Sequence, residues 1–99
     1  MPESNSLGGE GEREMEVTIK YFAWVRERIG IAEEKAVLPE SVTTAGDVIK
    51  WLKARGEGYA AAFEREDIIR AAIDQTHAKH NAPVAGAHEI AFFPPVTGG

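Results

Sequence analysis

The stretch TTAGDVIKWLKARG, residues 43–56, constrains the fold more than any other part of the chain. Its apolar residues follow the i, i+3, i+4, i+7 spacing, which places them on one side of an α-helix. Thr44 is suited to cap the first turn with Asp47 as its acidic partner, and Gly56 is suited to end the helix in a left-handed conformation. Such a helix must cover a sheet or another helix. Its apolar stripe consists of Ala45, Val48, Ile49 and Leu52.

Two strand patterns precede this helix. In EVTIKYFAWVRERIG, Val17, Ile19 and Tyr21 alternate with residues of the other face, which predicts a strand that ends near Gly30. EEKAVLPES predicts a second, shorter strand that stops at Pro39. We expect these two strands to form an N-terminal hairpin with its turn around Gly30.

The part of the chain after the helix is less clear. YAAAFEREDIIRAAIDQTHAKH has the alanines and charges of a helix, broken near Glu66–Asp67, but the part from Ile68 to His77 also suits a buried strand. NAPVAGAH is typical of a turn region, and EIAFF, residues 89–93, predicts the last strand. The order predicts an α+β fold with a mixed sheet, in which the first and last strands can be central neighbours.

Composition excludes several classes of function. The chain has 99 residues, with 16 acidic and 11 basic side chains and no basic stripe, so nucleic acid is not an expected partner. No apolar run approaches the length of a membrane span, and there is no cysteine for disulfides or thiolate chemistry. We expect a cytoplasmic protein with a disordered lead or tag at residues 1–14 and one domain at residues 15–99.

The sequence ends in FFPPVTGG, and this tail has unusual chemical properties. Pro94 and Pro95 fix their own backbone angles and offer no N–H groups, so the tail is expected to project from the domain. Gly98 and Gly99 lack a Cβ and can enter a channel too narrow for other residues. A terminal glycine carboxylate needs activation, for example by AMP, before it can transfer an acyl group. A terminus without function is the alternative, and the rigid prolines favour the functional interpretation.

Four stretches resemble the small subunit family of molybdopterin synthase. FFPPVTGG is similar to the terminus of that family, IKYFAWVRERIG to its first strand and turn, TTAGDVIKWLKAR to its first helix, and AIDQTHA to a later strand. The resemblance covers residues 15–99 and implies a β-grasp, ubiquitin-like fold packed by one main helix. It also favours a strand over a helix for Ile68–His77. One departure is GAHE before the last strand, where the family has Asp-Gly-Asp-Glu.

The resemblance implies a sulfur carrier, a non-catalytic donor subunit that works without a bound cofactor. The carboxylate of Gly99 would be adenylated by a ubiquitin-activating-type enzyme that consumes ATP. A sulfur donor, either a sulfurtransferase or a cysteine desulfurase, would convert it to a thiocarboxylate. The large synthase subunit would then accept the tail and receive sulfur for the dithiolene of molybdopterin. The implied tail contacts are Phe93, Pro94, Pro95, Val96, Thr97 and Gly98.

The resemblance also implies a docking surface beside the tail. Phe22 and Phe93 fall on the face opposite the regular apolar positions, where matching family residues contact partners; the alternative is that they belong to the core. Arg26 would add a polar contact at the rim, and a solvated surface charge is its alternative. His77, His80 and His88 lack the fourth ligand of a structural zinc site, so we predict no metal.

Two other functions use the same activation chemistry. One is a sulfur carrier for another pathway, such as thiamine or cysteine thiolation, against which the Phe-Phe-Pro-Pro stretch argues. The other is a protein modifier whose Gly99 forms an isopeptide bond with lysine. A passive binding module with an incidental tail is a third alternative.

Overall fold

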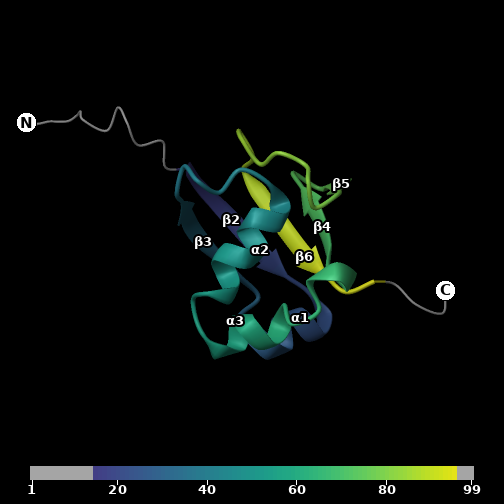
Figure 1. Cartoon of the computed structure of the whole chain (residues 1–99). Coiled ribbons are helices and arrows are strands. Elements are labelled where there is room, and N and C mark those ends of the chain that lie inside the picture. Colours follow the sequence, from purple (N-terminus) through teal and green to yellow (C-terminus); the bar gives the residue numbers. More distant parts are fainter. Residues whose placement is uncertain (1–14, 96–99) are drawn as a thin grey trace, which may run out of the picture.

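The computed structural model describes residues 15–95, in which five strands form one mixed sheet with the order β3-β2-β6-β4-β5 (Figure 1). The predicted residues of the disordered lead, 1–14, lie outside this range. The elements in chain order are β2 (Met15–Tyr21), α1 (Ala23–Ile29), β3 (Glu33–Leu38), α2 (Ala45–Lys53), α3 (Glu57–Ala62), the 3-10 turn η2 (Glu66–Ile68), β4 (Arg70–Ile73), β5 (Thr76–Ala78) and β6 (Glu89–Phe93).

The first and last strands are neighbours at the centre of the sheet, and this confirms the predicted mixed arrangement. β2 pairs with β6 in parallel, with Ile19 beside Ile90 and Tyr21 beside Phe92. The other pairs, β2 with β3, β4 with β6 and β4 with β5, are antiparallel. β6 therefore ends at the same end of the sheet as β2.

The predicted hairpin around Gly30 is wrong in one respect, because helix α1 connects its two strands. β2 ends at Tyr21, Phe22 is still extended, and Ala23, with a φ of 54°, then turns the chain into α1, where Val25 is buried. Gly30 closes α1 with a φ of 99°, and its N–H donates to the carbonyl of Arg26. The period-two pattern that we extended to Gly30 thus stops at Tyr21.

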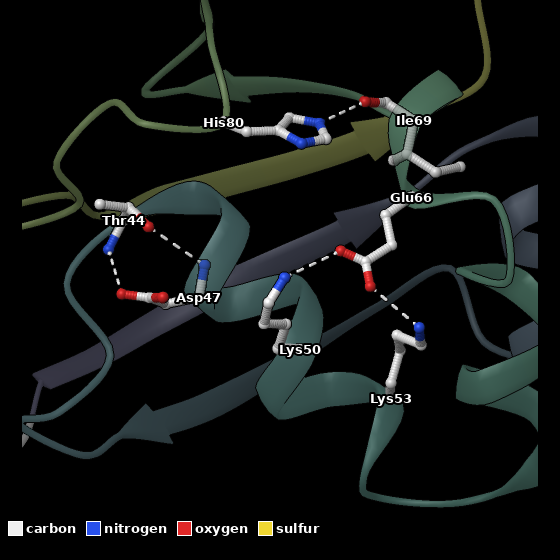
Figure 2. A network of polar contacts seen from close by, with 7 residues as sticks. All are labelled: Thr44, Asp47, Lys50, Lys53, Glu66, Ile69 and His80. Atoms are coloured by element: carbon white, nitrogen blue, oxygen red, sulfur yellow. Dashed lines mark hydrogen bonds and ion pairs between the residues drawn. The ribbon is translucent and has the colours of Figure 1, made fainter.

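Helix α2 forms as predicted at its N-terminus and differs at its C-terminus. The Thr44 hydroxyl accepts from the backbone N–H of Asp47, whose carboxylate accepts from the Thr44 N–H, so the capping box is complete (Figure 2). The residues of the predicted apolar stripe are all buried. The helix ends at Ala54 in a right-handed conformation, and Gly56, with a φ of 167°, precedes α3.

The ambiguous segment divides into a helix and a hairpin. α3 covers its first part, the chain breaks at η2 as expected near Glu66–Asp67, and strands β4 and β5 follow. The strand prediction for Ile68–His77 is confirmed in type, but the segment contains a turn. Asp74 and Gln75 form this turn with φ angles of 49° and 71°, a conformation that suits a two-residue hairpin loop.

The core lies between the sheet and the helices, which cover one face and one end of it (Figure 1). Its largest fully buried side chains are Tyr21, Phe63, Phe92, Ile19, Leu38, Ile49, Leu52, Ile69 and Ile90. They alternate along each central strand, because successive strand residues point to opposite faces. Between residues 15 and 95, every helix is too short to cross a bilayer as an apolar span.

Polar contacts hold η2 against α2 (Figure 2). Glu66 accepts from Lys50 at 3.2 Å and from Lys53 at 2.9 Å, and the hydrogen bond from Lys53 is the main cause that lowers the Glu66 pKa. The His80 Nε2 lies 2.7 Å from the Ile69 carbonyl, to which its N–H donates. Glu66 is half-buried and fixes the chain just before β4.

Candidate functional site

The end of β6 and the end of β2 lie side by side, and this places the start of the tail. Tyr21 pairs with Phe92, and the N–H of Phe22 donates to the carbonyl of Phe92 at 3.1 Å. The backbone of Phe22 therefore lies next to that of Phe93, although the two residues are far apart in sequence. Because side chains alternate along a strand, Phe93 points away from the face on which Phe92 is buried. We call Phe22, Phe93, Pro94 and Pro95 the tail base.

The aromatic rings of the tail base are only partly covered. Phe22 is 46% exposed, which excludes the core alternative for it, and Phe93 is half-buried. Exposed aromatic side chains are enriched at protein interfaces, where their burial contributes to binding. A docking role for both residues stays a prediction, and their position beside the tail is consistent with it.

Arg26 lies one helical turn after Phe22 on α1, and its side chain is exposed. It lines an open hollow of about 460 Å³ together with Glu27, Gly30, Ile31 and Ala32. Ile31 is 40% exposed, so this region combines an apolar surface with charge at its border. That combination is typical of the rim of an interface.

The tail continues from this base. Pro94 and Pro95 are half-buried and follow β6 directly. The other predicted tail residues, Val96, Thr97, Gly98 and Gly99, lie outside the described residues.

A polar cluster fixes the end of β2 from the helix side. The hydroxyls of Tyr21 and Tyr59 both donate to the same Glu34 oxygen at 2.7 Å, and Arg55 lies 3.7 Å from the other oxygen. Burial raises the pKa of Tyr21, and the hydrogen bond to Glu34 raises it further. The cluster joins β2, β3 and α3 directly behind Phe22. We did not predict this cluster from the sequence, since Glu34 is a charged residue on the side of β3 that also carries the buried Ala36 and Leu38.

Two residues that we did not predict lie beside Phe93. Arg70 is its partner in the β4–β6 register, and the ring of His77 on β5 lies 5.4 Å from the ring of Phe93. His77 pairs with Ala72, whose small side chain leaves room for the two rings to meet above it. Ala72 is only 8% exposed, although it lies on the face away from the helices. The hairpin register, which sequence alone did not provide, creates this arrangement.

The three histidines lie apart in the structure. His77 contacts Phe93, His80 contacts the Ile69 carbonyl, and the His88 side chain is 93% exposed near Asp74. In residues 15–95, no three metal-ligating side chains come close enough to hold an ion. Asp74 is occupied with the backbone N–H groups of His88 and Glu89, and these two bonds lower its pKa.

A family model and an individual related protein both match most of this chain. The ThiS family model matches residues 19–99. The molybdopterin synthase sulfur carrier subunit of Haemophilus influenzae is 37% identical over 83 residues, which are 84% of this chain and 99% of that protein.

Two solved structures share the fold. SAMP1 from Haloferax volcanii has a TM-score of 0.64 at 26% identity, covering 86% of this chain and 100% of that one. A putative molybdopterin converting factor, subunit 1, from Pyrococcus furiosus has a TM-score of 0.65 at 26% identity, covering 83% and 99%. These neighbours confirm the ubiquitin-like β-grasp fold. Because the family match extends over most of the sequence and includes its last residue, the chain belongs to the ThiS family.

Proposed function

We propose that this protein is the sulfur carrier subunit of a molybdopterin synthase. The observation that carries the proposal is the similarity to the Haemophilus influenzae subunit, which extends over 99% of that protein's length at 37% identity. The fold adds support, since β6 leads directly from the sheet into Pro94 and Pro95, and Phe22 and Phe93 are partly exposed beside that point.

The chemistry would take place at the carboxylate of Gly99. This carboxylate attacks the α-phosphate of ATP, so that an acyl adenylate forms and pyrophosphate leaves. The sulfur donor holds its sulfur as a persulfide, and a thiol reductant releases it as hydrosulfide while forming a disulfide. The hydrosulfide then attacks the acyl carbon, AMP leaves, and one oxygen of the carboxylate has been replaced by sulfur. The step neither oxidises nor reduces the acyl carbon. Because the sulfur is held on the C-terminus, the carrier needs no cysteine, and the chain has none.

Three partners follow from this chemistry. An adenylating enzyme must supply the ATP site, a sulfurtransferase or cysteine desulfurase must supply the sulfur, and the large synthase subunit must accept the loaded tail. ATP is consumed in the adenylating enzyme, so the carrier itself needs no bound cofactor. We place this activity in the cytoplasm. Narrow residues at the end of the tail allow its carboxylate to reach an enclosed active site.

The test is the intact mass of the protein after incubation with ATP, the cognate adenylating enzyme and sulfide. We expect a gain equal to the exchange of one oxygen for one sulfur, located at Gly99 by fragmentation. A variant that lacks Gly99 is the control and should keep its mass. An unchanged mass of the full chain, with an enzyme shown to be competent on another carrier, would contradict the sulfur chemistry.

A second candidate is a protein modifier, and the similarity to SAMP1, which is a small archaeal modifier protein, favours it. Activation at Gly99 would be the same, but the acyl group would pass to a lysine. A lysine-linked adduct that survives reducing agent would support this function. Transfer of sulfur to a molybdopterin precursor by the large subunit, without such adducts, would support the carrier.

A further inference from the structure

Basic side chains gather at the β4–β5 edge of the sheet, beside the tail base. Arg70, His77 and Lys79 line a hollow of about 270 Å³ together with Ala71 and Ala78. Arg70 and Lys79 also line a neighbouring hollow of about 240 Å³. We call Arg70, His77 and Lys79 the basic edge.

The charges of Arg70 and Lys79 are not neutralised within the described part of the chain. All three side chains of the basic edge are exposed, and none forms an ion pair with a carboxylate of residues 15–95. Asp67, which lines the second hollow, is engaged by Arg65 at 3.1 Å. Since the chain as a whole has a net charge of −5, this local positive region is a distinct feature of its surface.

The basic edge is continuous with the aromatic surface of the tail base. Arg70 pairs with Phe93 across the β4–β6 ladder, and the His77 ring lies 5.4 Å from the Phe93 ring. A protein that covers Phe93 must therefore lie within reach of Arg70 and Lys79. Opposite charges at such a border increase association rates and orient the two partners.

The phosphates of ATP fit the basic edge less well than an anion on a partner protein does. Gly99, whose carboxylate would react with the nucleotide, lies six positions beyond Phe93, and six residues reach at most about 20 Å. The basic edge lies beside Phe93, where the tail leaves the sheet, so the surface of the partner protein around the entrance for the tail would cover it.

We propose that the basic edge binds an acidic surface of the adenylating enzyme next to the entrance through which the tail passes. The proposal rests on the proposed function, because it takes the partner from that function. It adds that the partner surface is acidic and that Arg70, His77 and Lys79 recognise it.

The test uses the full chain and its cognate adenylating enzyme, with pyrophosphate release measured against carrier concentration. In Arg70→Glu and Lys79→Glu, we expect KM to rise roughly tenfold and kcat to stay unchanged, because rim charges act on association and not on the reacting carboxylate. The KM of the unmodified protein should rise with sodium chloride, and that of the variants should depend on salt less.

Lys35→Glu is the matched control. Lys35 is an exposed lysine on β3, at the opposite edge of the same sheet, and its substitution changes the net charge by the same amount. Its KM should equal that of the unmodified protein. Arg70→Gln removes the positive charge without adding a negative one, so its KM should rise less than that of Arg70→Glu. Circular dichroism of each variant checks the fold.

Three outcomes would overturn the proposal. Equal KM values for Arg70→Glu, Lys79→Glu and Lys35→Glu would show that the basic edge does not meet an acidic partner surface. A loss confined to kcat would place these residues near the nucleotide instead. If the unmodified carrier released no pyrophosphate with an enzyme competent on another carrier, the proposed function would fail, and the named partner would fail with it.

Discussion

Phe92 and Phe93 are adjacent, identical in type and on the same strand, yet their surroundings differ completely. Phe92 is fully buried, and its ring meets that of Phe63 edge-to-face at 5.4 Å between centroids. Phe93 is half-buried and contacts His77, an exposed residue of the edge strand β5. The strand alternation sends one ring to the helices and the other to the open face of the sheet.

The difference separates side chains that stabilise the fold from side chains that stay partly exposed beside the tail. On the covered face, large apolar side chains fill the space beneath α2 and α3, so substitutions there must change stability. On the open face, charged residues and the small Ala72 and Ala91 predominate, and the partly exposed aromatic rings stand beside the tail. Rings that contribute little to folding remain available to a partner.

The largest effect is expected from Phe92→Ala. The substitution leaves a cavity in a closed core and removes the contact with Phe63, so the free energy of unfolding should fall by about 3–5 kcal/mol. Urea unfolding followed by tryptophan fluorescence measures the loss. A decrease below about 1 kcal/mol, as for a surface substitution, would contradict the assignment of Phe92 to the core.

A second prediction tests how tightly the helices pack at the end of the covered core. A Cβ on Gly58 would lie 2.8 Å from the Arg28 carbonyl oxygen, a backbone atom that cannot move without shifting α1. Gly58→Ala should therefore lower the free energy of unfolding by about 1–3 kcal/mol.

Gly56→Ala is the control for this prediction. Gly56 has extended backbone and would meet only the Tyr59 side chain, at 3.8 Å. Thermal unfolding of both variants should separate them clearly. Equal melting temperatures would contradict the close contact between α1 and α3.

The covered face explains which parts of the fold could be predicted from the sequence. We predicted β2, β3, α2 and β6 from the regular spacing of their apolar residues. Each of these elements has one buried side, and the spacing of its apolar residues follows that side. The errors lie where backbone conformation decides. Nothing in the residue pattern indicated that Ala23 would adopt a φ of 54° and start α1, or that Asp74 and Gln75 would form a turn inside the predicted strand.

The candidate site was predictable in part for a different reason. We predicted Phe22 and Phe93 because strand alternation places both on the face opposite the regular apolar residues. The family resemblance then implied that residues at these positions contact partners. Arg70 and His77 were missed, since their proximity to Phe93 depends on the register of the β4–β5 hairpin. Long-range register is set by the whole fold, and one sequence contains little local information about it.

A third prediction concerns the cap of α2, where the covered face meets solvent. Thr44→Ala removes the hydroxyl that accepts from the Asp47 N–H and should cost about 1 kcal/mol of stability. Urea unfolding of this variant beside the unmodified protein measures the cost. Unchanged stability would contradict a role of the capping box in holding the helix.

The stability that the Asp47 carboxylate contributes to this cap should depend on pH. Hydrogen bonds from Thr43 are the main cause that lowers the Asp47 pKa from its ordinary value of 3.8. The stability from this carboxylate is therefore fully present above pH 3.8 and is lost as the pH falls through the lowered pKa of the folded state. The stability difference between the unmodified protein and Asp47→Asn should shrink as the pH is lowered from neutral to about 2. A difference that is constant over this range would mean that the carboxylate charge does not contribute.

A small change in stability and the clearest functional change are expected together in Phe93→Ala. Because the ring is half-buried on the open face, its loss should cost less stability than Phe92→Ala, on the order of 1 kcal/mol. If the ring docks the adenylating enzyme, KM for the carrier should rise roughly tenfold or more, since aromatic anchors dominate interface energetics. Pyrophosphate release measured with Phe93→Ala and Phe92→Ala, at a temperature where both are folded, separates the two effects. Equal KM values would show that the open face does not serve the partner, and that the contrast between the two rings concerns folding alone.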